Sequence, residues 1–134
     1  MDCKRSVLIV SGERGTREAL KTALKPLYQI KEAQDGFRAL QIIREHPIDL
    51  VALDLKQPRT DGSIVLMAIK NYDPTIEVLI LADYARLQNS IELVERGALG
   101  YLVTPFGVPQ LLNEVAHAME KRKSAAPLQH GQRR

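Results

Sequence analysis

Short apolar runs alternate with longer stretches in which apolar residues recur at helical spacing. Most of these runs are continuous rather than alternating, which is typical of parallel strands that are covered on both faces. The pattern predicts five strands, of which the second is weak: Val7–Val10, Gln29–Ala33, Leu50–Leu53, Val78–Leu81 and Tyr101–Val103.

The stretches that follow these runs each carry a stripe of apolar residues and predict five helices. Pro26, Pro47 and Pro74 are expected to end the first three helices. Gly97 is well placed just after the fourth helix, and Pro109 suits the first turn of the fifth. The stripes are Ala19, Leu20, Ala23, Leu24 and Leu27; Ala39, Leu40, Ile42 and Ile43; Ile64, Val65, Ala68 and Ile69; Leu87, Ile91 and Val94; and Leu111, Leu112, Val115, Ala118 and Met119.

A strand–helix alternation with short links predicts an α/β domain, a parallel sheet with helices on both faces. Function in such sheets gathers where the strands end at their carboxyl edge. The residues expected around this crevice are Ser11 and Gly12, Asp54, Ala82 and Asp83, and Thr104.

The domain is expected to span residues 5–123. From 124 to 134 the sequence loses its apolar periodicity, which indicates a disordered tail or the start of a linker.

Composition narrows the class of protein. A chain of 134 residues is expected to fold as one domain, and its single cysteine, Cys3, excludes an internal disulfide and favours a reducing compartment. No apolar stretch reaches the roughly 20 residues of a membrane span, and the first apolar run is too short for a signal peptide. We therefore expect a cytoplasmic protein without membrane contact.

The net charge of +3 does not predict nucleic-acid binding. Much of the excess lies in Lys121–Lys123 and Arg133–Arg134, and cations near the end of a helix are favoured by the helix dipole. The sequence has neither interleaved aromatic residues nor a DNA-reading motif.

Four stretches make the chain from about Arg5 to Lys123 resemble the receiver domain of bacterial two-component response regulators. They are DLVALDLKQPRTDG at 49–62, AQDGFRAL at 33–40, VLILADYA at 78–85 and ERGALGYLVTPF at 95–106. The resemblance implies a flavodoxin-like (βα)5 three-layer sandwich with strand order 2-1-3-4-5. It also places Asp54 at the phosphoacceptor position, Pro58 at the loop proline, and Asp61 and Gly62 in the turn that follows.

The sequence departs from the family at the other functional positions. The family has an acidic pair where this chain has Ser11 and Gly12, a Thr or Ser where it has Ala82, and a Lys where it has Thr104. The switch-type aromatic position is kept as Tyr101.

These departures remove the charges that phosphoryl transfer needs. The resemblance implies that Mg²⁺ and the lysine neutralise the incoming phosphoryl oxygens. Here the protein ligands for Mg²⁺ reduce to Asp54 and the backbone carbonyl of Lys56, because we expect Glu13 to point out of the crevice. The sequence therefore predicts lost or weak Mg²⁺ binding and no cofactor. Without a hydroxyl at Ala82, phosphorylation would have no link to Tyr101.

Each remaining candidate also has a purely structural interpretation. Two interpretations of Asp54 are equally well supported: a strand-end carboxylate that caps backbone amides, and a phosphoacceptor. Asp61 is expected to serve the turn before Gly62, and Asp83 to cap its loop or face water. Tyr101 is better explained as an amphipathic edge residue than as a working switch.

The stretch SGERGT at 11–16 offers a different chemistry. Its hydroxyls, glycine amides and following helix are suited to binding an anion, with Arg14 assisting. A flavin would also need aromatic walls, and the chain has no Trp and few other aromatics. Cofactor binding is therefore not expected.

The leading hypothesis is a degenerate receiver, not an enzyme, that acts by protein docking. The resemblance places its partner surface at Leu87–Lys121, for a histidine kinase, an output domain or a second copy of the chain. One alternative is slow phosphoacceptance by Asp54, and another is binding of a small ligand or anion at the crevice. The resemblance also implies a cis peptide bond between Thr104 and Pro105.

Overall fold

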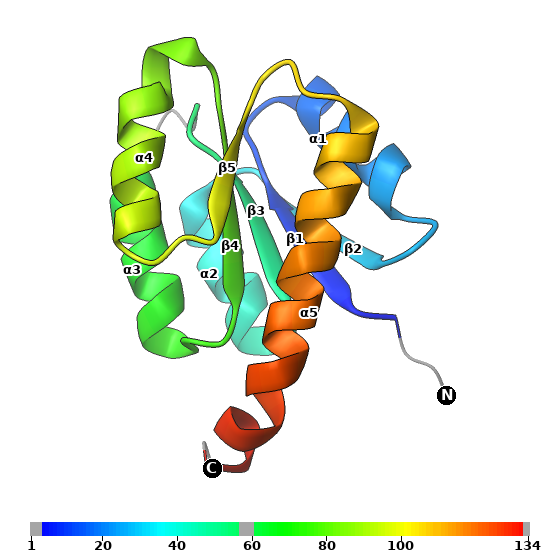
Figure 1. Ribbon diagram of the computed structural model, residues 1–134, viewed down its shortest axis with the longest axis vertical. Coiled ribbons are helices and arrows are strands. Elements are labelled where there is room, and N and C mark those ends of the chain that lie inside the picture. The colour runs from blue at the N-terminus through cyan, green and yellow to red at the C-terminus, as the bar shows by residue number, and fades with distance from the viewer. Residues whose placement is uncertain (1–3, 57–60, 133–134) are drawn as a thin grey trace.

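A single parallel sheet forms the centre of the molecule in the computed structural model, which describes residues 4–56 and 61–132 (Figure 1). The strands lie in the order β2-β1-β3-β4-β5, so the predicted order 2-1-3-4-5 is confirmed. Each strand lies within one residue of its predicted bounds. The strands are β1 (Ser6–Val10), β2 (Gln29–Ala33), β3 (Leu50–Asp54), β4 (Glu77–Ala82) and β5 (Gly100–Val103).

Helices cover both faces of this sheet and complete the predicted three-layer sandwich (Figure 1). In β1, Val7 and Ile9 pack on the face covered by α1 and α5. Leu8 and Val10 pack on the face covered by α2, α3 and α4. Two cores follow from the alternation of side chains along each strand. The helices are α1 (Arg14–Leu24), α2 (Gly36–Glu45), α3 (Gly62–Tyr72), α4 (Leu87–Glu95) and α5 (Val108–Gln132).

The turn before α3 is built on Asp61 and Gly62. Asp61 caps the helix, because its carboxylate accepts a hydrogen bond of 2.8 Å from the amide of Ser63. A Cβ at Gly62 would lie 2.5 Å from Leu55 Cδ2, so a larger residue there would require the Leu55 side chain to move. Asp61 thus serves the turn as predicted, whereas Pro58 lies outside the described residues.

The end of α4 also follows the sequence. Gly97 lies just beyond the helix with a φ of +120°, a backbone conformation that favours glycine.

The predicted stripe of α4 was only partly right. Leu87, Ile91 and Val94 are only half-buried, and the residues that α4 buries are Ser90 and Leu93. Ser90 is tolerated in the interior because its hydroxyl donates to the carbonyl of Arg86 over 3.0 Å. Val94 still packs against the core from its half-buried position, whereas Ser90 and Leu93 form the buried side of the helix.

The stripes of α1 and α3 were also wrong at single positions. Ala19 is exposed, Leu27 lies beyond the last residue of α1, and Ile64 in the first turn of α3 is exposed.

Arg122 in the second half of α5 holds this helix against the sheet, and it is only 5 % exposed. Its guanidinium donates to Asp49 Oδ1 over 2.8 Å and to the hydroxyl of Thr75, and lies 3.9 Å from Asp73 Oδ2. Arg122 is therefore a buried anchor between α5 and the amino-terminal edge of the sheet. The interpretation of this residue as an ordinary helix-end cation was wrong.

The course of α5 differs from the expected end of the domain. Pro109 lies in its first turn as predicted, and the helix then continues past Lys123 to Gln132. Residues 124–132 are thus helical where a tail or linker start was expected, and a domain boundary near Lys123 stays a prediction. No helix in 4–56 or 61–132 has the length and apolar character needed to cross a membrane.

Candidate functional site

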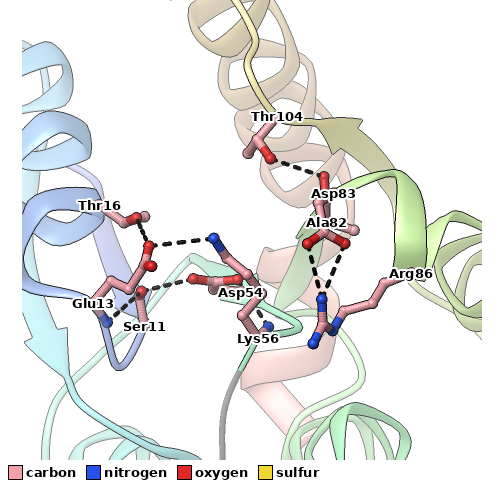
Figure 2. Close-up of polar contacts among 9 residues, drawn as sticks. All are labelled: Ser11, Glu13, Thr16, Asp54, Lys56, Ala82, Asp83, Arg86 and Thr104. Carbon is pink, nitrogen blue, oxygen red and sulfur yellow. Dashed lines mark hydrogen bonds and ion pairs between the residues drawn. The ribbon is translucent and has the colours of Figure 1, made fainter.

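The predicted site residues meet at the carboxyl edge of the sheet. Ser11 follows β1, Asp54 ends β3, Ala82 ends β4 and Thr104 follows β5. These four strands are neighbours in the sheet, so their ends lie side by side (Figure 2). The structure thereby brings together the positions that the sequence singles out.

Asp54 lies at the bottom of this site and is held by two uncharged donors. Ser11 and Asp54 are both buried, at 0 % and 3 % exposure. The Ser11 hydroxyl donates to Asp54 Oδ2 over 2.7 Å, and the amide of Lys56 donates to Oδ1 over 3.0 Å (Figure 2). Each carboxylate oxygen therefore has a hydrogen bond within the chain.

Glu13 turns back over the site instead of pointing out of it. Its Oε1 lies 3.3 Å from Lys56 Nζ and accepts a hydrogen bond of 2.7 Å from the Thr16 hydroxyl. The Thr16 hydroxyl and then the Lys56 ammonium lower the pKa of Glu13 below its usual range. The prediction that Glu13 points outward was wrong, because the ammonium attracts its carboxylate across the strand ends.

Thr104 and Ala82 form the other side of the site. Ala82 is 1 % exposed and packs into the core beneath α2, α3 and α4. The amide of Thr104 donates to the carbonyl of Ala82 over 2.7 Å, and the Thr104 hydroxyl approaches the same oxygen at 3.4 Å (Figure 2). The hydroxyl is thus engaged with the backbone of β4. The peptide bond between Thr104 and Pro105 is cis, as predicted.

Asp83 is tied to its own loop. Its two carboxylate oxygens accept hydrogen bonds of 3.1 and 2.9 Å from Arg86 Nη1. Desolvation alone would raise the pKa of Asp83, but the bonds and charge of Arg86, with a smaller contribution from Lys56, lower it overall. Asp83 is therefore paired with a side chain of its own loop, and its carboxylate does not cap the backbone amides there as one expectation had it.

Comparison with known proteins identifies the family. The sequence matches the family model described as response regulator receiver domain over residues 7–116. The chain belongs to this family. It is 36 % identical over 110 residues to sporulation initiation phosphotransferase F of Bacillus subtilis (strain 168). The aligned region covers 81 % of this chain and 89 % of that protein.

A second relative is longer. The chain is 33 % identical over 102 residues to the transcriptional regulatory protein ZraR of Klebsiella oxytoca. The aligned region covers 75 % of this chain but only 23 % of ZraR. Among solved structures, the response regulator receiver domain protein from Clostridium thermocellum superposes with a TM-score of 0.86 at 27 % identity, over 90 % of this chain and 98 % of that one. The fold and the place in two-component signalling are those of a receiver.

The residues present in this receiver do not fit the Mg²⁺ ion that the family implies. Ser11 and Gly12 carry no charge, both oxygens of Asp54 are engaged, and Glu13 is paired with Lys56. In the part of the chain that the structure describes, no three His, Cys, Asp or Glu residues lie close enough to hold a metal ion. Mg²⁺ is usually held by one or two carboxylates together with several waters, and here the carboxylates of Asp54 and Glu13 are already engaged by groups of the chain.

The loop after β1 is not arranged as an open anion cradle. The amide of Glu13 is already bonded to the Ser11 hydroxyl at 3.1 Å, and the negative charge of Glu13 lies over the loop. Arg14 is exposed at the start of α1. This geometry offers no support to anion binding by the receiver at residues 11–16.

Arg17 and the side chain of Lys56 were missed by sequence reasoning, which considered only the backbone carbonyl of Lys56. Arg17 donates to the carbonyl of Ser11 over 2.9 Å and pairs with Glu32 on β2, and Lys56 reaches Glu13. Neither ion pair has a local sequence signal, because Glu32 lies on β2 far along the chain from Arg17, and Lys56 follows β3 while Glu13 precedes α1.

Tyr101 lies on the edge strand β5 beside Ile80 of β4, and its side chain is 37 % exposed. The receiver thus presents this aromatic residue at its surface.

Proposed function

We propose that this receiver is degenerate and signals by protein docking, without Mg²⁺-dependent phosphorylation and without catalysing a reaction of its own. The observation that carries the proposal is the hydrogen bond between the Ser11 hydroxyl and Asp54 Oδ2. An uncharged hydroxyl takes the position from which an acidic side chain of the family would help to hold the metal ion.

Acceptance of a phosphoryl group needs positive charge close to the incoming oxygens. Thr104 supplies none, and its hydroxyl is turned to the carbonyl of Ala82. The ammonium of Lys56 is paired with Glu13. The groups around Asp54 therefore favour a stable resting carboxylate over phosphoryl transfer.

The residue that would link phosphorylation of Asp54 to a movement of Tyr101 is also missing. Ala82 has only a methyl group, which packs into the core, so it cannot follow a phosphoryl group on Asp54. The exposed ring of Tyr101 is then free of control from the site. The state of this receiver would be set by what binds it, since a ligand shifts an equilibrium only by its different affinities for two states.

The docking surface that we propose is the segment Leu87–Lys121, which contains α4, β5 and much of α5. Leu87 and Ile91 on α4 are half-buried, and Tyr101 and Val108 are exposed. Apolar side chains at the surface are suited to a protein partner, which would be a histidine kinase, an output domain or a second copy of the chain.

The proposal is tested by incubating the protein with a small phosphodonor and Mg²⁺ and measuring its intact mass. We expect no added phosphate, in the wild type as in an Asp54→Asn variant. A receiver domain with the full acidic set serves as the positive control. A single-phosphate adduct in the wild type that is absent from Asp54→Asn would overturn the proposal.

The second candidate function is slow phosphoacceptance by Asp54. It is favoured by the position of this carboxylate at the end of β3, and by a relative whose name describes a phosphotransferase. The same mass measurement over a time course, with and without Mg²⁺, separates it from the first: slow, Asp54-dependent labelling would support this candidate.

A further inference from the structure

The carboxylates around the site already have partners within the chain. Glu13 pairs with the ammonium of Lys56, and both carboxylate oxygens of Asp83 accept hydrogen bonds from Arg86. Asp54 accepts a hydrogen bond from the backbone amide of Lys56 (Figure 2). Glu13 and Asp83 are thus each paired with a cation of the chain, whereas Asp54 is held by uncharged donors.

Lys56 is the residue that joins these groups. It lies two residues after Asp54, its amide donates to Asp54 Oδ1 over 3.0 Å, and its Nζ lies 3.3 Å from Glu13 Oε1. Its positive charge also contributes to the lowered pKa of Asp83 on the opposite side of the site. The side chain is only 33 % exposed, so it lies along the site rather than in open solvent.

We propose that the Lys56 ammonium is the resident cation of this receiver, and that it keeps divalent ions out by occupying the carboxylate of Glu13 beside Asp54. The inference rests on the proposed function and deepens it, because it names what keeps the metal out. An ammonium on a flexible stem neutralises a carboxylate without the oxygen ligands and fixed geometry that Mg²⁺ demands.

Glu13 is the partner that makes this arrangement specific. It reaches Lys56 from the loop after β1, and its carboxylate is also held by the Thr16 hydroxyl. An exposed ion pair contributes little to stability, so its expected effect is on the affinity for added cations rather than on folding.

The test uses Mn²⁺ as the probe, with binding followed by the relaxation of water protons. Removal of the ammonium in Lys56→Met or Lys56→Gln is expected to raise Mn²⁺ affinity by roughly tenfold over the wild type, since a nearby positive charge is lost. Lys56→Arg keeps the charge and is expected to bind as weakly as the wild type. Adding Glu13→Gln to Lys56→Met should remove the gain.

A matched control removes the same charge elsewhere. Lys25 is exposed and follows the last residue of α1, at the far end of that helix from the site. Lys25→Met is expected to leave Mn²⁺ affinity unchanged, and an equal gain in this variant would overturn the inference as a general charge effect.

The remaining outcomes separate the inference from the proposed function. If neither the wild type nor the Lys56 variants bind Mn²⁺, the resident-cation inference fails while the loss of the metal site stands. If the wild type binds Mn²⁺ as tightly as Lys56→Met, both fail, because the receiver then holds a divalent ion beside its own lysine.

Discussion

The hydroxyl of Ser11 lies 2.7 Å from Asp54 Oδ2, with both side chains buried at the carboxyl edge of the sheet. The same hydroxyl accepts a hydrogen bond of 3.1 Å from the amide of Glu13. Ser11 therefore links the loop after β1 to the end of β3. This linking role of Ser11 can be tested by measuring the stability of a variant.

Ser11→Ala is expected to lower the free energy of unfolding by about 1–3 kcal/mol, because it leaves a buried carboxylate oxygen without its donor. Urea unfolding monitored by circular dichroism measures the change. Thr16→Ala is the control, since its hydroxyl bonds the exposed carboxylate of Glu13, and it should change stability by less than about 0.5 kcal/mol. Equal losses in the two variants would contradict the assigned role of Ser11.

Ser11→Asp is expected to make stability depend on Mg²⁺. A second carboxylate placed against Asp54 introduces like-charge repulsion, which a divalent cation relieves. In EDTA the variant should unfold at lower urea than the wild type. Saturating Mg²⁺ should restore about 2–3 kcal/mol, the gain expected for a ligand at roughly 100 times its dissociation constant.

The neutral variant Ser11→Asn separates charge from size in that experiment. It is expected to respond to Mg²⁺ no more than the wild type does. If Ser11→Asp is equally insensitive, the missing acidic side chain is not what prevents metal binding in this receiver.

The sheet was predictable from the sequence because its central strands are buried on both faces and therefore read as continuous apolar runs. The turn at Asp61 and Gly62 was predictable for a related reason, since capping and close backbone approach restrict the residue types that fit. Asp54 was found from its place at the end of a strand. These features all depend on local sequence.

Contacts between distant exposed or charged residues were not predictable. Glu13 and Lys56 are 43 positions apart, and Arg122 and Asp49 are 73 apart. Nothing in the local sequence distinguishes these residues from solvated charges. The orientation of α4 was missed because burial of Ser90 depends on a hydrogen bond to Arg86, which apolar periodicity does not register.

Arg122→Met is expected to destabilise the protein by about 3–5 kcal/mol, which is the usual cost of removing one partner of a buried ion pair. The side chain is 6 % exposed and its loss leaves Asp49 and Asp73 without their shared guanidinium. Arg5 also approaches Asp49, at 3.4 Å, but is 32 % exposed. Arg5→Met should therefore cost less than about 1 kcal/mol in the same urea measurement. A comparable loss in both variants would argue against a special role for Arg122.

Acid should weaken the fold through Asp49. Burial alone would raise the pKa of this carboxyl, but the amide of Ser6 and the guanidinium groups of Arg122 and Arg5 lower it overall. A group whose pKa is lower in the folded state contributes stability above its unfolded pKa of about 4, and this is lost as the pH falls through the folded pKa. Urea midpoints should therefore be steady near neutral pH and fall below about pH 4, in the acid range where Asp49 takes up its proton.

Asp49→Asn removes this titration and isolates its contribution. The variant is expected to be less stable than the wild type at pH 7, because Arg122 loses its charged partner. It should also lose less stability than the wild type on acidification, so that the two curves converge at low pH. Glu18→Gln, at an exposed position on α1, serves as control for general acid effects, and parallel curves for wild type and Asp49→Asn would show that another carboxylate governs the acid transition.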